Sequence, residues 1–374
     1  MIQREVNLEN NIQKNKVLII YGARRVGKTT LLNDFLKTTK LKYKLDNGDN
    51  IRLQELLQSQ DFSRIKEYVE GYELIALDEA QQIPNIGMAL KIIVDQVKDI
   101  HVIVTGSSSF DLSQKVGEPL TGRKKTFILH PFSQSEMKMQ YNTYELKEKL
   151  DSFLIFGSYP DVVLAKTKKE KIDILNELVD SYLLKDVLTL DNIKFSKKLL
   201  DLLKSLAFQV GNLVSLNELS QQVGLDVKTV DRYLDLLEKG FVIKRVGGFS
   251  RNLRNEITNK SKYYFLDNGI RNALISQFNS LDKRDDIGAL FENFLIMDRM
   301  KNNNLASNYY FWRNYEGKEI DLIEEKEGIL YAYEFKWNKS RVKPPKNFIG
   351  SYKNSKFEVI NKDNYLDFLI TSFT

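Results

Sequence analysis

The chain has 374 residues, of which 42% are hydrophobic and 28% charged, so it is long enough for two to four globular domains. It contains no cysteine and only two histidines, which excludes disulfides and thiolate metal sites and argues against a zinc enzyme. The formal net charge of +6 weakly favours polyanionic partners, and any metal is expected to be a hard cation held by carboxylates.

The N-terminal segment MIQREVNLENN has neither the apolar core of a signal peptide nor the Arg/Ser-rich, acid-poor composition of a transit peptide. No apolar run approaches the roughly 20 residues that a helix needs to span a bilayer. We therefore expect a cytoplasmic protein that makes no use of a membrane.

The first motif is a phosphate-binding loop. An apolar run of the buried-strand type, Val17 to Tyr21, leads directly into GARRVGKTT, which matches G-x-x-x-x-G-K-[ST] and precedes an apolar helical pattern. Backbone N–H groups of such a loop surround phosphates at a helix N-terminus, while Lys28 would reach the terminal phosphates and Thr29 would bind Mg²⁺. The sequence therefore predicts that a nucleoside triphosphate, ATP or GTP, binds to the loop residues Gly22, Arg24, Arg25, Val26, Gly27, Lys28, Thr29 and Thr30.

Two further apolar strands end in residues that hydrolysis needs. Leu74 to Leu77 are followed by Asp78, which would hold Mg²⁺ through water, and by Glu79, which would orient and deprotonate the attacking water. The strand in HVIVTGSSSF ends in polar residues that either sense the γ-phosphate or form an ordinary Ser/Gly loop: Thr105, Ser107 and Ser108.

These segments, with LTGRKKTFILHPFSQSE, span about residues 15–136 and resemble the AAA-type ATPases often described in bacteria and archaea only as ATP-binding proteins. Such chains pair the ATPase module with a C-terminal region known as DUF4143. The resemblance implies an α/β P-loop NTPase fold with a parallel sheet, ATP and Mg²⁺ as cofactors, and a homo-oligomer. In such ATPases an arginine before the last core strand can act on the neighbouring subunit's nucleotide, which makes Arg123 the candidate arginine finger. The alternative is that Arg123 is a surface residue of the basic run GRKK.

The middle of the chain is expected to be helical. Residues 137–197 show helical apolar spacing, interrupted at FGSYP, and are expected to form the lid of the ATPase without chemistry of their own. Residues 198–250 have the order of a winged helix-turn-helix, with Gly224 in the turn, Asp226 as the N-cap of the second helix, and FVIKRVGGF as the wing.

The second of these helices would present four residues to DNA, namely Lys228, Thr229, Arg232 and Tyr233. It also carries three acids, so base-specific readout is less plausible than contact between the wing and the phosphate backbone. From 239 to 262 there are seven Lys and Arg, Arg254 among them, against one acid, Glu256. The alternative is a winged helix that serves only for packing or for protein contacts.

The C-terminal part carries a carboxylate pattern on two strands. Glu292 lies on an amphipathic helix, Asp321 on the strand EIDLI, and Glu334 and Lys336 on one face of the strand LYAYEFKW. This order resembles the PD-(D/E)XK nuclease core, an α/β restriction-endonuclease-like fold. The resemblance implies that Asp321 and Glu334 hold Mg²⁺, that Glu292 adds a ligand, and that Lys336 positions or activates water. The proline that names the motif is absent before Asp321, and charges on a solvated strand face remain the alternative.

The expected organisation is therefore an ATPase core at 1–136, a helical lid at 137–197, a winged helix-turn-helix at 198–250 and a nuclease-like domain at 251–374. The expected function is Mg²⁺-dependent ATP hydrolysis coupled to a DNA-associated domain whose cleavage activity is open. The alternative is a nucleotide-dependent switch or assembly protein whose C-terminal regions only bind partners.

Overall fold

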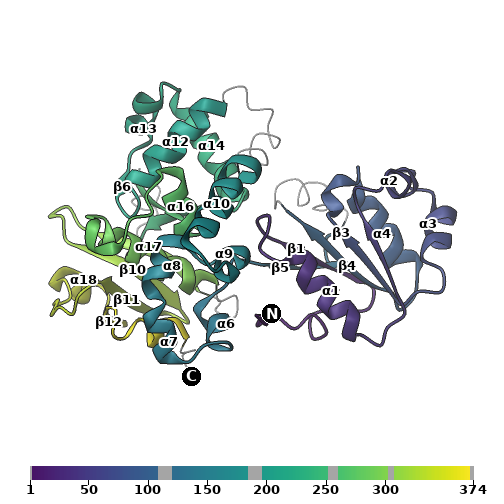
Figure 1. Ribbon diagram of the computed structural model, residues 1–374, viewed down its shortest axis with the longest axis horizontal. Coiled ribbons are helices and arrows are strands. Elements are labelled where there is room, and N and C mark those ends of the chain that lie inside the picture. Colours follow the sequence, from purple (N-terminus) through teal and green to yellow (C-terminus); the bar gives the residue numbers. More distant parts are fainter. Residues whose placement is uncertain (1, 108–119, 184–195, 252–259, 302–306, 371–374) are drawn as a thin grey trace. The chain divides into compact units, whose positions relative to one another are not determined.

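The computed structural model describes residues 2–107, 120–183, 196–251, 260–301 and 307–370. The chain forms two compact units (Figure 1). The N-terminal unit comprises Arg4–Pro131 with Lys239–Phe241, and the C-terminal unit comprises Phe132–Glu238 and the described residues from Val242 onward. Within the described ranges, no helix is both long and apolar enough to cross a membrane.

The N-terminal unit contains a five-stranded sheet with the order β2-β3-β4-β1-β5, in which every neighbouring pair is parallel. The carboxyl ends of all its strands therefore lie along one edge, as expected for the parallel α/β fold predicted from the sequence. Its strands are β1 (Lys16–Tyr21), β2 (Tyr43–Asn47), β3 (Leu74–Asp78), β4 (His101–Gly106) and β5 (Lys124–Ile128).

Helices cover this sheet because their apolar residues recur on one side. Residues of α2, α3 and α4 share one core with the buried positions of β1, β3 and β4. Asp61 caps α3 by accepting hydrogen bonds from the backbone N–H groups of Ser63 and Arg64. The helices are α1 (Lys28–Thr38), α2 (Ile51–Gln58), α3 (Phe62–Val69) and α4 (Ile86–Gln96), with a 3₁₀ turn at Ala80–Gln82.

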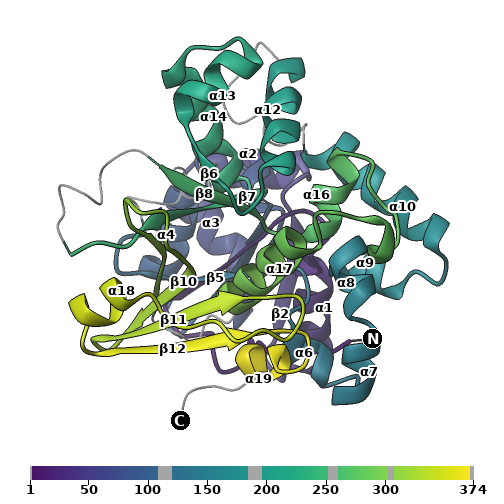
Figure 2. The ribbon, with the colours of Figure 1, turned by 90° about the vertical axis from the view of Figure 1, so that its left-hand side faces the viewer.

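The C-terminal unit contains a mixed seven-stranded sheet with the order β12-β11-β10-β9-β7-β8-β6. The pairs β7–β9 and β11–β12 are parallel and the other neighbours are antiparallel. Figure 2 shows this sheet with α17 lying over it. Its strands are β6 (Leu213–Val214), β7 (Ile243–Gly248), β8 (Ser261–Phe265), β9 (Asn308–Arg313), β10 (Glu319–Lys326), β11 (Ile329–Phe335) and β12 (Ser355–Ile360).

The helices of the C-terminal unit fall into three groups. The first group is α6 (Gln134–Lys138), α7 (Thr143–Glu148), α8 (Leu150–Phe156), α9 (Pro160–Leu164) and α10 (Lys168–Glu177), continued by a π-helix at Leu178–Leu183. The second is α12 (Ser196–Phe208), α13 (Leu216–Val223) and α14 (Val227–Lys239). The third is α16 (Asn268–Leu274), α17 (Ile287–Lys301), α18 (Lys346–Ser351) and α19 (Tyr365–Ile370), with a 3₁₀ turn at Leu281–Lys283.

The first helical group differs in its partners from the ATPase lid that we expected. Asn272 of α16 donates hydrogen bonds to the carbonyls of Leu154 and Ile155 in α8, at 3.1 and 2.8 Å. Asp267, which caps α16, accepts a 2.8 Å bond from Gly269 N–H and a 2.7 Å bond from Ser158 N–H in the FGSYP break. These buried bonds join the first helical group to α16, and both belong to one compact unit. Residues 184–195 of the expected lid lie outside the described residues.

Candidate functional site

The phosphate loop connects β1 to α1 at the carboxyl edge of the parallel sheet. A Cβ on Gly22 would lie 2.2 Å from the carbonyl oxygen of Leu129, so only glycine fits where the chain leaves β1. Gly27, the N-cap of α1, has a φ of 95°, which also favours glycine. Arg25 takes a positive φ of 59°, and Arg24 beside it is half-buried. The loop is thus held in a conformation that turns the chain sharply into the N-terminus of a helix.

Lys28 lies within the loop, where 4% of its surface is exposed. Its Nζ donates to the carbonyl oxygens of Gly22 and Ala23, at 2.8 and 2.9 Å. The ammonium group is therefore held under the loop in which phosphates would bind. Val26, next to Gly27, is fully buried, and Thr30 is exposed.

Arg4 is a residue of this site that the sequence did not indicate. Its guanidinium donates to the backbone carbonyl of Val26 in the loop and, at 3.1 Å, to that of His130 after β5. It thereby ties the N-terminal segment to the phosphate loop. No motif surrounds Arg4, and its partners are 22 and 126 residues away along the chain.

Three polar side chains meet beside the start of α1. The hydroxyl of Thr29 donates to Asp78 Oδ2 at 2.8 Å, and the hydroxyl of Thr105 donates to Asp78 Oδ1. Asp78 ends β3 and Thr105 lies near the end of β4, so the parallel register brings them together. A hydroxyl and one carboxylate are hard oxygen ligands of the kind that Mg²⁺ takes when waters and substrate phosphates complete its shell. The residues present therefore fit this cation.

Glu79 belongs to a second chain of contacts at the same edge. It has a positive φ of 50°, and its N–H donates to the hydroxyl of Thr105 at 3.0 Å. The side-chain amide of Gln81 donates to Glu79 Oε2 and, at 3.0 Å, to Ser107 Oγ. The positive φ turns Glu79 out of the strand direction, and Gln81 links its carboxylate to the predicted γ-phosphate sensor. Ser108, the other candidate sensor, lies outside the described residues.

Arg123 lies at the opposite edge of the sheet from its own phosphate loop. It directly precedes β5, where Lys124 pairs with Val17 at the amino end of β1, whereas the loop follows Tyr21 at the carboxyl end. At about 3.3 Å per residue in a parallel strand, this separates the two by roughly 15 Å. The Nε of Arg123 donates to Asp95 Oδ1 at 2.6 Å. Arg123 and the phosphate loop of the same chain therefore lie at opposite ends of the parallel strands.

A second polar cluster lies in the C-terminal unit, around Lys262 of β8. Its Nζ is 3.1 Å from Glu292 Oε1 on α17 and 2.5 Å from Glu319 Oε1 on β10. Tyr264, two residues along β8, donates to the same oxygen of Glu292 at 2.7 Å. Sequence reasoning counted Lys262 among the basic residues of the expected wing, which is wrong because its side chain is 1% exposed and pairs with two carboxylates. It missed Tyr264, which belongs to no part of the D…E-x-K pattern.

The two strands with the predicted carboxylates meet next to this cluster. Asp321 Oδ2 accepts a hydrogen bond from Phe335 N–H at 2.8 Å, and Lys336 Nζ donates to Glu334 Oε1 at 2.6 Å. The pairing of β10 with β9 is irregular between Ile320 and Ile323, which is a β-bulge at Asp321. The bulge lets Asp321 reach the backbone of β11 while its neighbours remain in the core.

Two parts of the chain that carry residues of these sites match known families. Residues 14–138 match the AAA domain, and residues 287–367 match a domain of unknown function, DUF4143. The chain carries an AAA domain and a DUF4143 domain. These matches confirm the resemblance to AAA-type ATPases with a C-terminal DUF4143 region. Residues 147–281, between them, match another domain of unknown function, DUF8612.

Relatives in other organisms align with most of this chain. An uncharacterized protein of Methanocaldococcus jannaschii is 25% identical over 370 residues, covering 91% of this chain and 80% of that protein. An uncharacterized protein of Haemophilus influenzae is 26% identical over 364 residues, covering 89% of this chain and 86% of its own. An uncharacterized protein of Mycobacterium tuberculosis is 24% identical over 335 residues, covering 88% of this chain and 72% of that protein.

Among solved structures, replication initiator DnaA bound to AMPPCP and single-stranded DNA aligns at 15% identity over 61% of this chain and 84% of its own, with a TM-score of 0.30. The RuvB Holliday junction branch migration motor of Thermotoga maritima aligns at 14% identity over 62% and 82%, with a TM-score of 0.27. Scores this low decide nothing about this chain.

Burial and mutual charge shift the pKa values of the cluster around Lys262. Burial raises the pKa of Glu292 to about 7, although the charge of Lys262 opposes the rise. Burial also raises the pKa values of Asp321 and Glu334. Burial lowers the pKa of Lys262, but the charges of Glu292, Asp321 and Glu319 outweigh it, so the net pKa lies above its usual value. The surrounding carboxylates therefore favour the charged form of Lys262.

The metal site expected from Glu292, Asp321 and Glu334 is not assembled as a ligand set. Among the residues that the structure describes, no three or more His, Cys, Asp or Glu side chains are grouped so as to hold a metal ion. The physical reason is that their charges already have partners: Lys262 binds Glu292, Lys336 binds Glu334, and Asp321 accepts from the backbone. The residues in this arrangement do not fit the metal centre predicted for the DUF4143 domain.

The helix-turn-helix elements follow the expected order within the DUF8612 match. Gly224 ends α13 with a φ of 63°, and Asp226 caps α14 by accepting a 2.9 Å bond from Thr229 N–H. Lys228 and Arg232 are exposed, whereas Tyr233 is 1% exposed. The prediction that Tyr233 faces DNA is therefore wrong, because it belongs to the apolar stripe of α14.

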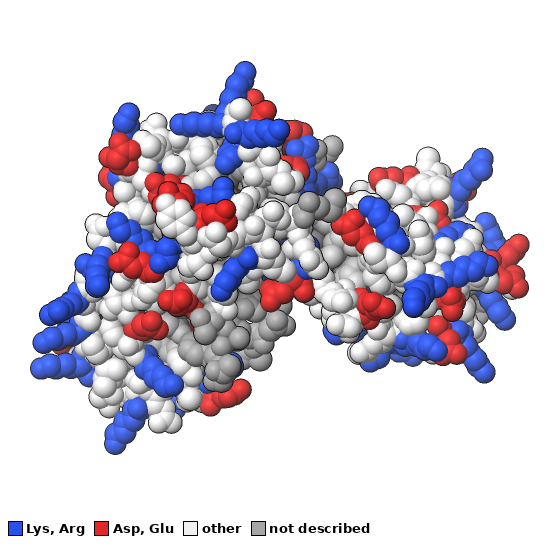
Figure 3. Space-filling view, turned by 60° about the horizontal axis from the view of Figure 1, so that its bottom comes forward, with Lys and Arg blue, Asp and Glu red and all other residues white. Residues whose placement is uncertain are grey.

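The two basic side chains of β7, the strand that follows, lie next to acids that offset part of their charge. Lys244 pairs with Glu238 at 2.6 Å, and Arg245 lies 3.7 Å from Asp231. On the face of the molecule in Figure 3, basic side chains are interspersed with acidic ones. Arg254 and Glu256 of the expected wing lie outside the described residues.

Proposed function

We propose that the AAA domain binds Mg-ATP and hydrolyses it to ADP and phosphate. The observation that carries this proposal is the hydrogen-bonded arrangement at the carboxyl edge of the parallel sheet. There the phosphate loop, the Thr29–Asp78 pair and the Glu79–Gln81–Ser107 chain converge.

The residues divide the work as follows. The phosphate loop and Lys28 bind the phosphates and offset their charge, and Thr29 and Asp78 would hold Mg²⁺, which neutralises charge developing on the phosphates. Glu79 orients a water and accepts its proton. Gln81 holds the carboxylate of Glu79 and connects it to Ser107, which would contact the γ-phosphate.

Phosphate release from ATP by the full chain tests the proposal, measured with and without Mg²⁺ and with and without duplex DNA. Mg²⁺-dependent release that DNA accelerates, less so at higher salt, supports ATP hydrolysis coupled to a DNA-associated C-terminal unit. Release that a protein partner accelerates and DNA does not would instead support the second candidate, a nucleotide-dependent switch or assembly protein. In the cluster around Lys262, the carboxylates of Glu292 and Glu334 already pair with lysines, which favours a binding module over a nuclease, and we assign the cluster no step of cleavage.

Arg123 is proposed to act on the nucleotide of a neighbouring copy. Arg123→Ala should then lower ATP turnover with little change in ATP affinity, because the side chain lies at the edge opposite its own phosphate loop. Mixing Arg123→Ala and Glu79→Gln chains should restore part of the activity, since one interface in a mixed oligomer then contains both wild-type residues. Lys125→Ala, an exposed neighbour on β5, is the matched control. No recovery in a demonstrated mixed oligomer, or full activity as a monomer, would count against a finger.

DNA contact is proposed for the exposed basic residues of the helix-turn-helix and wing. Each phosphate contact contributes about 0.9 to the slope of log affinity against log salt concentration. Lys228→Ala combined with Arg251→Ala should reduce that slope by up to about 2. Fluorescence anisotropy on a labelled duplex between roughly 50 and 200 mM salt measures it. Lys204→Ala, an exposed change on α12, should leave the slope unchanged, and an unchanged slope in the double variant would remove α14 and the wing from the DNA interface.

A further inference from the structure

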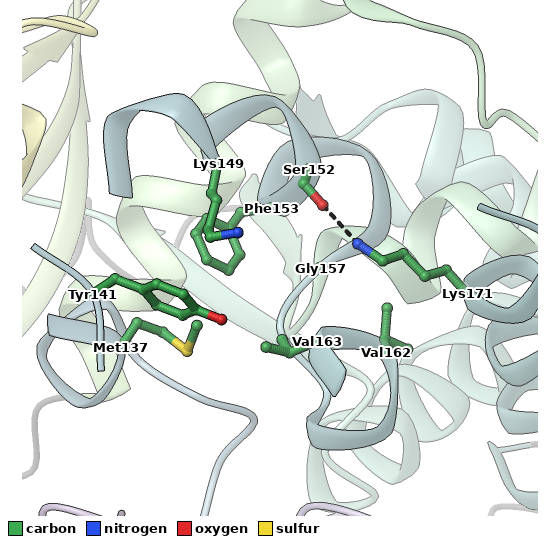
Figure 4. Close-up of a pocket in the computed structure, with 9 residues that line it drawn as sticks. All are labelled: Met137, Tyr141, Lys149, Ser152, Phe153, Gly157, Val162, Val163 and Lys171. Carbon is green, nitrogen blue, oxygen red and sulfur yellow. Dashed lines mark hydrogen bonds between the residues drawn. The ribbon is translucent and has the colours of Figure 1, made fainter. Parts of the chain in front are cut away.

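A pocket in the first helical group of the C-terminal unit is lined by residues to which no function has been given above. It lies between the end of α6, helices α8 and α9, and the first turn of α10 (Figure 4). Its volume of about 70 Å³ is several times the roughly 10–15 Å³ that one water needs. The lining residues are Met137, Tyr141, Lys149, Ser152, Phe153, Gly157, Val162, Val163 and Lys171.

The polar groups of this pocket are cationic or hydroxylic, and none of its lining residues is an acid. Lys149, Tyr141 and Lys171 turn their polar ends into it, as Figure 4 shows. The Nζ of Lys171 donates to Ser152 Oγ at 3.1 Å. The Nζ of Lys149 lies 4.8 Å from the centre of the Tyr141 ring. Among the described residues, neither ammonium group has a carboxylate partner within an ion-pair distance.

The two ammonium groups are close enough to affect one another. Burial lowers the pKa of Lys171, and the charge of Lys149 lowers it further. Two like charges facing one half-buried pocket repel each other and cost free energy in the empty protein. An anion between them would relieve that repulsion and would accept charge-assisted hydrogen bonds from both.

The remaining wall of the pocket is apolar. Met137, Phe153 and Val162 are buried, and Val163 lies beside them on α9. An inorganic anion would leave these side chains without a partner, whereas an aliphatic group of two or three carbons would cover them.

We infer that this pocket binds a small organic anion, with a carboxylate or phosphate head between Lys149 and Lys171 and a short apolar body on Phe153 and the two valines. The hydroxyls of Tyr141 and Ser152 donate to the same head group. None of these residues belongs to the phosphate loop or to the cluster around Lys262, so this is a third and separate site.

Isothermal titration of the full chain with propionate and with ethyl phosphate tests the inference, and neutral propionamide is the ligand control. At least one of the two anions should bind and propionamide should not. Lys149→Met and Lys171→Met should each weaken binding by about tenfold or more, because each removes a charge-assisted hydrogen bond. Lys169→Met, the same change on the exposed side of α10, should bind like the wild type.

The melting temperature of the unliganded variants separates a binding site from a structural role. Removing one of two repelling charges should leave Lys171→Met melting no lower than the wild type. A role in holding α8 against α10 through Ser152 would instead lower the melting temperature. Absence of binding by both anions, equal binding of propionamide, or equal affinities in all three lysine variants would overturn the inference.

Discussion

Glu79→Gln is expected to reduce the rate of ATP turnover by about 10²–10⁴-fold, the usual contribution of a positioned general base. The amide has nearly the shape of the carboxylate but cannot accept the proton of the attacking water. Since Lys28, Thr29 and Asp78 are untouched, the affinity for ATP should stay within a few-fold of the wild type. Steady-state phosphate release and equilibrium binding of a labelled nucleotide, measured on one preparation, separate the two effects.

The matched control is Glu70→Gln, the same change at an exposed position of the AAA domain after α3. It should have wild-type turnover. Unimpaired turnover in Glu79→Gln would show that another group activates the water, and Asp78 would then be the next candidate. A large loss of ATP affinity in Glu79→Gln would instead mean that Gln81 and Ser107 are displaced when their partner changes.

Lys262→Met is expected to destabilise the C-terminal unit by about 3–5 kcal/mol, the cost of removing one partner from a buried ion pair. The ammonium of Lys262 is 1% exposed and contacts two carboxylates directly, and Met fills its stem but carries no charge. Glu292, Glu319 and Asp321 would then face one another without a buried cation. Addition of Mn²⁺ should stabilise this variant more than the wild type, because the divalent ion binds the folded carboxylate cluster.

The measurement is urea unfolding followed by tryptophan fluorescence. Both tryptophans of the chain, Trp312 and Trp337, lie in the C-terminal unit, so the signal reports that unit alone. Lys244→Met is the control, because its ion pair with Glu238 is 47% exposed on the lysine side and should contribute at most about 1 kcal/mol. Equal losses of unfolding free energy in the two variants would mean that the charge of Lys262 does not stabilise the carboxylate cluster.

The phosphate loop could be predicted from the sequence because all of its residues are close together in the chain. Strand, glycine loop and helix follow one another within about 25 residues, and the spacing of the two glycines, the lysine and the threonine is visible in the sequence. The contact of Thr29 with Asp78 is expected once parallel strands are assumed, because the carboxyl ends of such strands lie along one edge of the sheet. The strand order β2-β3-β4-β1-β5 does not follow from that assumption.

Contacts between residues far apart in the sequence could not be predicted from local motifs. Arg4 supports the loop through two backbone carbonyls, and nothing in its neighbourhood marks it. The helices between 137 and 183 have clear apolar faces, but such a face does not say which element covers it. Their partners, Asn272 and Asp267, lie more than 100 residues further along the chain.

The charge partners of the C-terminal carboxylates could not be predicted for the same reason. The spacing of Asp321, Glu334 and Lys336 predicted their neighbourhood on adjacent strands, yet a pattern of acids cannot show that a lysine from another strand already offsets them. The prediction that Tyr233 faces DNA was wrong for a simpler reason. Its position on α14 is three residues after Val230, which places it on the buried stripe rather than on the exposed face.

The most direct test of the proposed ATP hydrolysis is phosphate release from ATP by the purified full chain beside its Lys28→Ala variant, each with and without Mg²⁺. We expect release by the wild type that requires Mg²⁺, and none above background in Lys28→Ala, because the phosphates lose the ammonium group held under the loop. Equal release by the two chains, or release by the wild type that is unchanged when Mg²⁺ is removed, would contradict the assignment of this site as an ATP hydrolase.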